Sequence, residues 1–133
     1  MPTRDDEKTQ FVEVAGDLEI AGLLWAPEIG DEVTSRENTT RVSVLVDPQG
    51  MRPDELRLHY LWLPTVEQMV FQFEARQAIL FHAGLELSPQ NLCYKTVVQA
   101  PHGQIECRGT NLRISMGLAL RSLLLGDNAE LVN

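Results

Sequence analysis

A histidine, an acid and a cysteine lie close together in the stretch TVVQAPHGQIECRG, residues 96–109. The three are His102, Glu106 and Cys107. Histidine serves enzymes as a general base and cysteine as a nucleophile, provided that the two side chains come within hydrogen-bonding reach. The stretch therefore has two interpretations, a reactive Cys–His pair or a tight turn between two strands.

The surrounding pattern favours the turn. If His102 and Gly103 are the central residues of a hairpin, Ala100 faces Ile105 and one side of the hairpin is apolar. Cys107 then points into the apolar side, roughly 15 Å along the strand from His102 at about 3.3 Å per residue. This register predicts an exposed turn histidine and a small core cysteine.

Other signatures of catalysis or metal binding are missing from the chain. No phosphate-binding loop, nucleophile elbow or HExxH motif is present. The two cysteines, Cys93 and Cys107, have no histidine at the short spacing of a zinc site, although the chain has three histidines (His59, His82 and His102). We therefore expect neither a cofactor nor a metal ion.

The length and hydropathy of the chain indicate one globular domain. The chain has 133 residues, of which 44% are hydrophobic, and no apolar run long enough for a transmembrane helix. Its polar, acidic start lacks the apolar core of a signal peptide, so we expect a cytoplasmic protein without membrane contact. Residues 1–9 are predicted to be a flexible acidic tail, and residues 10–133 a single α+β domain.

The net charge of −8 is concentrated near the N-terminus. Residues 1–40 contain ten acidic and three basic residues, whereas residues 41–133 contain nine acidic and eight basic residues. No basic stripe is available to neutralise phosphates, so nucleic-acid binding is not expected. The acidic segment is interpreted as a solvated surface or as an arm that meets a basic partner.

The first half of the chain reads mainly as strands. Two strands are expected between residues 10 and 25 around the turn pair Gly16-Asp17, then a polar loop at 28–40 and an alternating strand at 41–47. Residues 56–63 fit either a strand or a helix that starts at Pro53, and their alternation favours the strand. Whether the 28–40 loop is ordered stays open.

Two helices are expected in the second half. Thr65 and Gln68 fit a capping box, which predicts a helix over residues 66–82 with Gly84 beyond its end. A second helix is expected between Asn111 and Gly126, and its 112–125 stretch is apolar almost all round. One sheet cannot cover such a helix, so we expect the other helix or a second copy of the protein to cover the rest.

The expected order of elements is β-β-β-β-α-β-β-α, a two-layer α+β domain with a mainly antiparallel sheet and two helices on one face. The last four elements, from the helix at 66–82 to the helix at 112–125, are similar in order to the small acidic type III secretion chaperones. That resemblance implies a dimeric α+β protein that binds peptide segments. The leading helix of those chaperones is absent from the expected order.

These observations predict a non-enzymatic interaction or assembly module that forms a homodimer. Trp25 ends an early strand and is interpreted either as an exposed partner contact or as a core residue. The alternative is an anion-binding protein or small enzyme, with a cleft near the C-terminal helix in which Arg113 and Arg121 grip the ligand.

Overall fold

The structure is a computed structural model that describes residues 4–87 and 92–132, with side chains for 6–87 and 92–126. Its described part has the expected mixture of helices and antiparallel strands. The order of elements differs from the expected one: α1 (Arg4–Ile20), β1 (Glu32–Ser35), β2 (Asn38–Val44), α2 (Pro53–His59), β3 (Tyr60–Trp62), α3 (Val66–Ala75), β4 (Ile79–Leu87), β5 (Leu92–Ala100), β6 (Gly103–Gly109) and α4 (Leu112–Val132).

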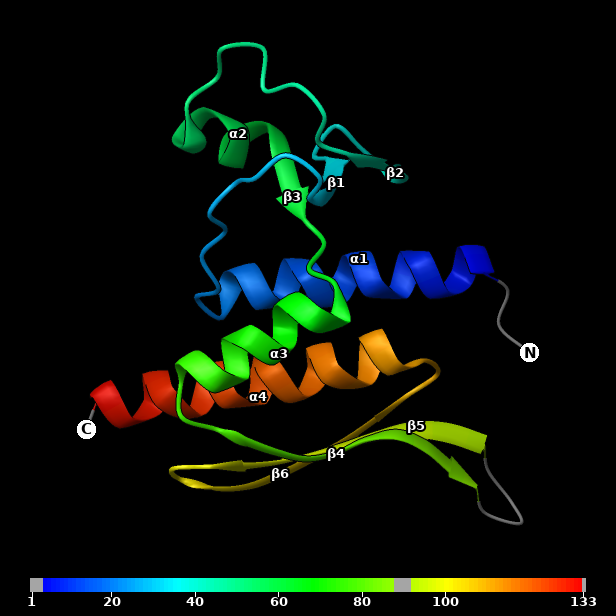
Figure 1. Cartoon of the computed structure of the whole chain (residues 1–133), viewed down its shortest axis with the longest axis vertical. Coiled ribbons are helices and arrows are strands. Elements are labelled where there is room, and N and C mark those ends of the chain that lie inside the picture. The colour runs from blue at the N-terminus through cyan, green and yellow to red at the C-terminus, as the bar shows by residue number, and fades with distance from the viewer. Residues whose placement is uncertain (1–3, 88–91, 133) are drawn as a thin grey trace.

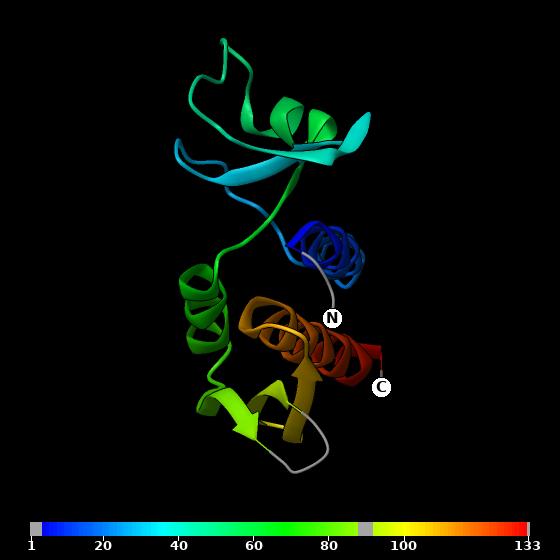
Figure 2. The same ribbon diagram turned by 90° about the vertical axis from the view of Figure 1, so that its right-hand side faces the viewer.

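Two three-stranded antiparallel sheets enclose the helices instead of one sheet lying beneath them. The first sheet has the strand order β2-β1-β3 and carries α2, and the second has the order β4-β5-β6. Helices α1, α3 and α4 lie between the sheets (Figure 1), and the view turned by 90° shows the same sequence of layers (Figure 2). The prediction of two layers with both helices on one face of a single sheet is therefore wrong.

The largest correction concerns residues 10–25, where two strands were expected. Residues 4–20 form α1, whose buried stripe follows helical spacing: Phe11, Val14, Ala15 and Leu18. The helix ends at Ile20, two residues before Gly22, which has a φ of 109°, and Leu23 N–H donates to Leu18 O at 2.9 Å. In the segment expected to be a flexible tail, residues 4–9 belong to this helix, while residues 1–3 lie outside the described part.

Residues 28–40 also differ from the expected polar loop. Strands β1 and β2 form an antiparallel hairpin there, and Val33 in its middle is 1% exposed. Residues 53–63 combine both interpretations of that segment, because a helix starts at Pro53 as one of them required and gives way to the short strand β3. The predicted strand at 41–47 is confirmed only as far as Val44.

The capping box that starts α3 is confirmed. Thr65 Oγ1 accepts from Gln68 N–H at 3.1 Å, and Gln68 Oε1 accepts from Thr65 N–H at 2.9 Å. The helix ends at Ala75, not at residue 82, because Gln77 adopts a φ of 58° and Ala78 N–H closes onto Phe73 O at 3.0 Å. Strand β4 follows, where the C-terminal part of the helix had been expected.

The β5–β6 hairpin has the predicted apolar and polar faces in a register shifted by two residues. Ala100 pairs with Gly103 rather than with Ile105, which pairs with Val98. Pro101 is preset for the first central position of the turn, so the turn consists of Pro101 and His102, and only Gly103 needs a positive φ, 147°. A shift of two residues keeps every side chain on its expected face.

Helix α4 starts as predicted, since Asn111 Oδ1 accepts from Ile114 N–H at 2.8 Å. It continues past Gly126 to Val132. Gly126 is not a helix end but a point of close approach, because a Cβ there would collide with the ring of His102. Residues 112–125 are covered by α1 and α3 as well as by β5 and β6. Of the two covers expected for this helix, the other helix or a second copy, the contacts support the first, with α1 as a further cover.

No helix in the described part of the chain is long and apolar enough to cross a membrane.

Candidate functional site

Trp25 is a core residue, so the interpretation of an exposed aromatic is not supported. Its side chain is 5% exposed and packs in a small cluster with Val33, Leu45 and Leu56 beneath the first sheet. The indole N–H donates to Asp31 Oδ2 at 2.8 Å. This hydrogen bond fixes the orientation of the ring within the cluster.

Asp31 is the polar centre that holds this region together. It is buried, and besides the indole its carboxylate accepts from Glu28 N–H at 2.9 Å and from Gln68 Nε2 at 2.8 Å. Three donors satisfy both carboxylate oxygens, as a buried charge requires. The segment after α1 is thereby tied to the start of α3.

Arg113 bridges α4 to the chain that leaves β3. Its Nε donates to Pro64 O at 2.8 Å and its Nη2 to Leu63 O at 2.6 Å, while Nη1 forms an ion pair with Glu32 at 3.0 Å. The guanidinium carbon lies 4.3 Å from the ring centre of Phe11. Each nitrogen of this guanidinium therefore has a partner within the chain.

Arg121 lies two turns further along α4 and also contacts α1. Its Nη1 pairs with Asp17 Oδ2 at 3.2 Å, and its Nε is buried without a hydrogen-bond partner among the described residues. The two arginines thus join helices. Neither arginine is among the residues that line the hollow described below.

His102 and Cys107 do not face one another. His102 lies over Gly126, and Cys107 Sγ is 4.0 Å from Ser122 Oγ. Burial raises the pKa of the Cys107 thiol, the opposite of what an activated nucleophile needs. Within the described residues, no three histidine, cysteine or acidic side chains converge as metal ligands.

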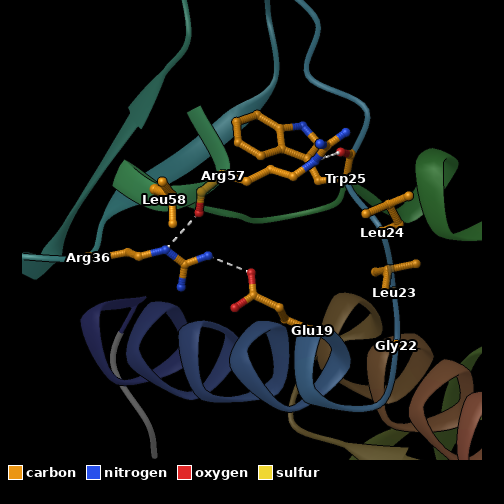
Figure 3. A pocket seen from close by; sticks show the side chains of 8 residues that line it. All are labelled: Glu19, Gly22, Leu23, Leu24, Trp25, Arg36, Arg57 and Leu58. Carbon is orange, nitrogen blue, oxygen red and sulfur yellow. Dashed lines mark hydrogen bonds and ion pairs between the residues drawn. The ribbon is translucent and has the colours of Figure 1, made fainter. Parts of the chain in front are cut away.

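A hollow of about 540 Å³ lies at the C-terminal end of α1, between that helix and α2 (Figure 3). Residues distant in sequence meet there: Glu19, Gly22, Leu23, Leu24, Trp25, Arg36, Arg57 and Leu58. The sequence shows no motif for this site. Of its lining residues, the sequence analysis named only Trp25 as a candidate partner contact. That prediction assumed an exposed side chain, whereas Trp25 is buried.

The rim of the hollow is apolar and exposed. Leu24 is 70% exposed and Leu58 75%, values high enough for both side chains to be available to a partner. A second hollow of about 210 Å³ shares Leu24 and extends to Trp62 and to the exposed ring of Phe71 on α3. Leu24 lines both hollows, which we together call the Leu24 groove.

Two arginines stand at one end of the Leu24 groove. Arg36 donates from Nε to Arg57 O at 3.0 Å and pairs through Nη2 with Glu19 at 2.6 Å. Arg57 donates from Nε to Trp25 O at 2.6 Å. The structure records no partner for the Nη1 and Nη2 groups of Arg57 within its described part. In Figure 3 the side chain of Arg36 lies between the backbone carbonyl of Arg57 and the carboxylate of Glu19, and the side chain of Arg57 runs toward Trp25.

A second exposed apolar surface follows β4, an edge strand of the second sheet. Its large exposed side chains are Ile79, Phe81, Leu85 and Leu87. The face of this sheet turned away from the helices carries a network of four charges, in which Lys95 and Arg108 each bind Glu86 and Glu106. The hydrogen bond and charge of Lys95 lower the pKa of Glu106, and the charge of Glu86 raises the pKa of Arg108.

Comparison with known proteins identifies no relative. No protein-family profile matches the sequence, and searches of curated proteins and of solved structures returned no significant match. Inferences about function therefore rest on the two apolar surfaces and the charges beside them.

Proposed function

We propose that this protein is a non-enzymatic interaction module that forms a homodimer by pairing the β4 strands of two copies. The observation that carries the proposal is the apolar strand β4, which is an edge of the second sheet among the described residues. An edge strand presents unpaired backbone N–H and C=O groups, and natural proteins usually block them with lysine, proline or charged side chains. In β4 the single charged residue is Glu86, and proline is absent from all nine positions.

The side chains of β4 are complementary to a second copy of themselves. In the part of β4 that follows its β-bulge, a two-fold axis near Leu85 brings Leu85 opposite Leu85 of the second copy and Leu87 opposite Ala83. No like charges oppose one another in this arrangement. The β-bulge between Leu80 and His82 leaves Phe81 without a partner on β5, and its ring is 63% exposed.

The resemblance to the type III secretion chaperones adds no support, because it rested on two strands between the last two helices and the structure has three, β4, β5 and β6, between α3 and α4. The alternative, an anion site at Arg113 and Arg121, has less support. Both guanidinium groups already bind other parts of the same chain.

The test is the mass of the protein in solution, measured by sedimentation equilibrium from one to about one hundred micromolar, since homodimers of this kind assemble by mass action. The expected result is a dimer that the Phe81→Lys and Leu87→Lys variants convert to a monomer. The control is Ile29→Lys, which alters a residue that is 72% exposed but lies outside β4, and it should remain dimeric. A wild-type monomer throughout the range, or a dimer unaffected by both β4 variants, would overturn the proposal.

A further inference from the structure

We infer that the Leu24 groove binds a peptide segment in which a carboxylate side chain is next to aliphatic ones, with Arg57 holding the carboxylate. This site is separate from the β4 edge, and it assigns a ligand class to a surface that self-association does not use. The inference rests on the geometry of Arg57, on the balance of charge around it, and on the shape of the groove.

Arg57 is held ready for a carboxylate. Its Nε is fixed by the carbonyl of Trp25, whose indole is fixed in turn by the buried Asp31. The backbone carbonyl of Arg57 accepts from Arg36, which holds the start of the side chain from a second direction. The two Nη groups stay available, and a guanidinium presents such donors in the parallel arrangement that a carboxylate accepts.

The charges around the hollow favour an anion with a single negative group. Glu19 is neutralised by Arg36 at 2.6 Å, so Arg57 is the cation without an acidic partner among the residues that line the hollow. This local positive charge stands out in a chain whose net charge is −8. Nucleic acid is a poor fit, because binding to a phosphate backbone needs several cations along a strip.

The rim supplies apolar contacts on both sides of that cation. Leu58 follows Arg57 directly in α2, and Leu24 reaches the groove from the opposite wall. Both side chains are mostly exposed, so aliphatic side chains of a ligand would remove apolar area from water on each side. A carboxylate flanked by aliphatic groups therefore matches the arrangement of the site.

The groove is shaped for a chain rather than for an enclosed small molecule. Sites for small ligands bury most of the ligand surface. Here two open hollows, of about 540 and about 210 Å³, are both lined by Leu24, and Phe71 lines the smaller one. At the far end, Gln72 Oε1 is occupied by Arg76 Nη1, which leaves the Gln72 amide N–H groups for a peptide carbonyl.

The test uses the peptide acetyl-Leu-Leu-Asp-Leu-Leu-amide and its Asn counterpart, which has the same shape without the charge. Trp25 and Trp62 line the two hollows and are the chain's two tryptophans, so intrinsic fluorescence reports on binding directly. The Asp peptide should bind about tenfold more tightly than the Asn peptide, the ratio expected for a charge-assisted bidentate contact. Octanoate serves as a small-molecule probe with the same chemistry and should bind more weakly than the Asp peptide.

Variants separate the roles of the cation and the apolar rim. Arg57→Gln should remove the preference for Asp over Asn, whereas Leu24→Ser should weaken both peptides alike. Arg52→Gln is the matched control, because Arg52 is exposed and paired with Glu55 outside the groove. It should bind both peptides as the wild type does. Phe81→Lys should also bind normally, which keeps this result independent of the homodimer.

Three outcomes would overturn the inference. The first is equal binding, or no binding, of the Asp and Asn peptides to the wild-type protein. The second is octanoate binding at least as tightly as the Asp peptide, which would indicate a fatty-acid-like ligand instead. The third is an Arg52→Gln variant that loses the Asp preference as Arg57→Gln does. If Arg57→Gln fails to fold, the comparison between the two peptides on the wild type and on Leu24→Ser still decides the question.

Discussion

Two glycines in helices should respond in opposite directions to the same change, alanine substitution. Gly16 lies in α1 with no atom within 4 Å of the position that a Cβ would occupy. Gly117 lies where α4 crosses α1, and a Cβ there would be 2.6 Å from Val14 Cγ1 and 3.3 Å from Phe11 Cε1. Alanine is better than glycine in a helix interior by about 1 kcal/mol. At Gly117 alone, the stabilisation of the helix by alanine is opposed by the collision of the new Cβ with Val14 and Phe11.

The collision at Gly117 is large enough to decide the sign. Carbon atoms pack best at about 3.5–4.0 Å, so Val14 would have to move by about 1 Å within a core where it is 7% exposed. Overpacking of this kind costs about 1–3 kcal/mol. After subtraction of the helix gain, Gly117→Ala should lower the free energy of unfolding by about 1 kcal/mol, and Gly16→Ala should raise it by about 1 kcal/mol.

Urea unfolding followed by circular dichroism measures both free energies. A double variant then tests the cause: Val14→Ala removes the methyl groups that collide, so the combination with Gly117→Ala should be at least about 1 kcal/mol more stable than additivity predicts. If Gly117→Ala stabilises the protein as much as Gly16→Ala does, α1 does not cross α4 at this glycine. The position assigned to α1 would then be wrong.

Two further predictions concern residues that the sequence singled out. Arg113→Lys should lower the free energy of unfolding by about 2–4 kcal/mol, because a lysine cannot reach Leu63 O, Pro64 O and Glu32 together, yet it should leave peptide binding unchanged. Urea unfolding and the fluorescence titration check the two parts, and a stable variant with impaired binding would contradict the structural role. Burial raises the pKa of the Cys107 thiol, so near pH 8 it should be alkylated by iodoacetamide more slowly in the folded protein than in urea, as peptide mass spectrometry would show. Equal rates in the two states would contradict that burial.

Local signals in the sequence identified those features that depend on a few neighbouring residues. The capping box at Thr65 and Gln68, and the cap at Asn111, are hydrogen bonds within one turn of helix. The two faces of the β5–β6 hairpin follow from alternation alone. Its register was wrong by two residues because Pro101, rather than Gly103, determines the turn.

Helix α1 was missed because two local signals compete. Phe11, Val14, Ala15 and Leu18 have the spacing of a helix face, a signal that was present in the sequence and could have been used. The pair Gly16-Asp17 suggested a hairpin turn instead. In the structure no close neighbour of Gly16 requires a glycine there. The residue that suggested a turn lies inside helix α1 instead.

Strand β4 could not be predicted from its own neighbourhood. It begins only because α3 stops at Ala75, and the residue that adopts the left-handed conformation there is Gln77, where glycine would be the usual signal. A residue other than glycine costs about 1–2 kcal/mol in that conformation. Pairing of β4 along β5 offsets the cost, and such pairing is tertiary information.

The Leu24 groove could not be predicted from the sequence, because it too depends on tertiary structure. Glu19, Leu24, Arg36 and Arg57 come from four separate parts of the chain, and no spacing links them. The sequence alone does not show that the side chains of Leu24 and Leu58 remain exposed to solvent after folding. Their exposure, 70% for Leu24 and 75% for Leu58, depends on how distant segments pack, which only the fold determines.

The position of α1 also changes the physical argument for a dimer. From the sequence, the apolar circumference of residues 112–125 required a cover that a single sheet could not supply. Helix α1 supplies that cover from the same chain, with Phe11, Val14 and Leu18 in the same core as Leu120. A dimer is therefore not needed to shield α4.

Among the described residues, β4 pairs with β5 on one side only, so the second sheet ends at this strand. The two origins of a dimer predict different behaviour. A dimer that shielded α4 would unfold when it dissociated, because its core would be exposed to water. A dimer joined at β4 would separate into folded monomers, so Phe81→Lys should abolish association while the α1–α4 core, and with it the helical circular dichroism, is retained.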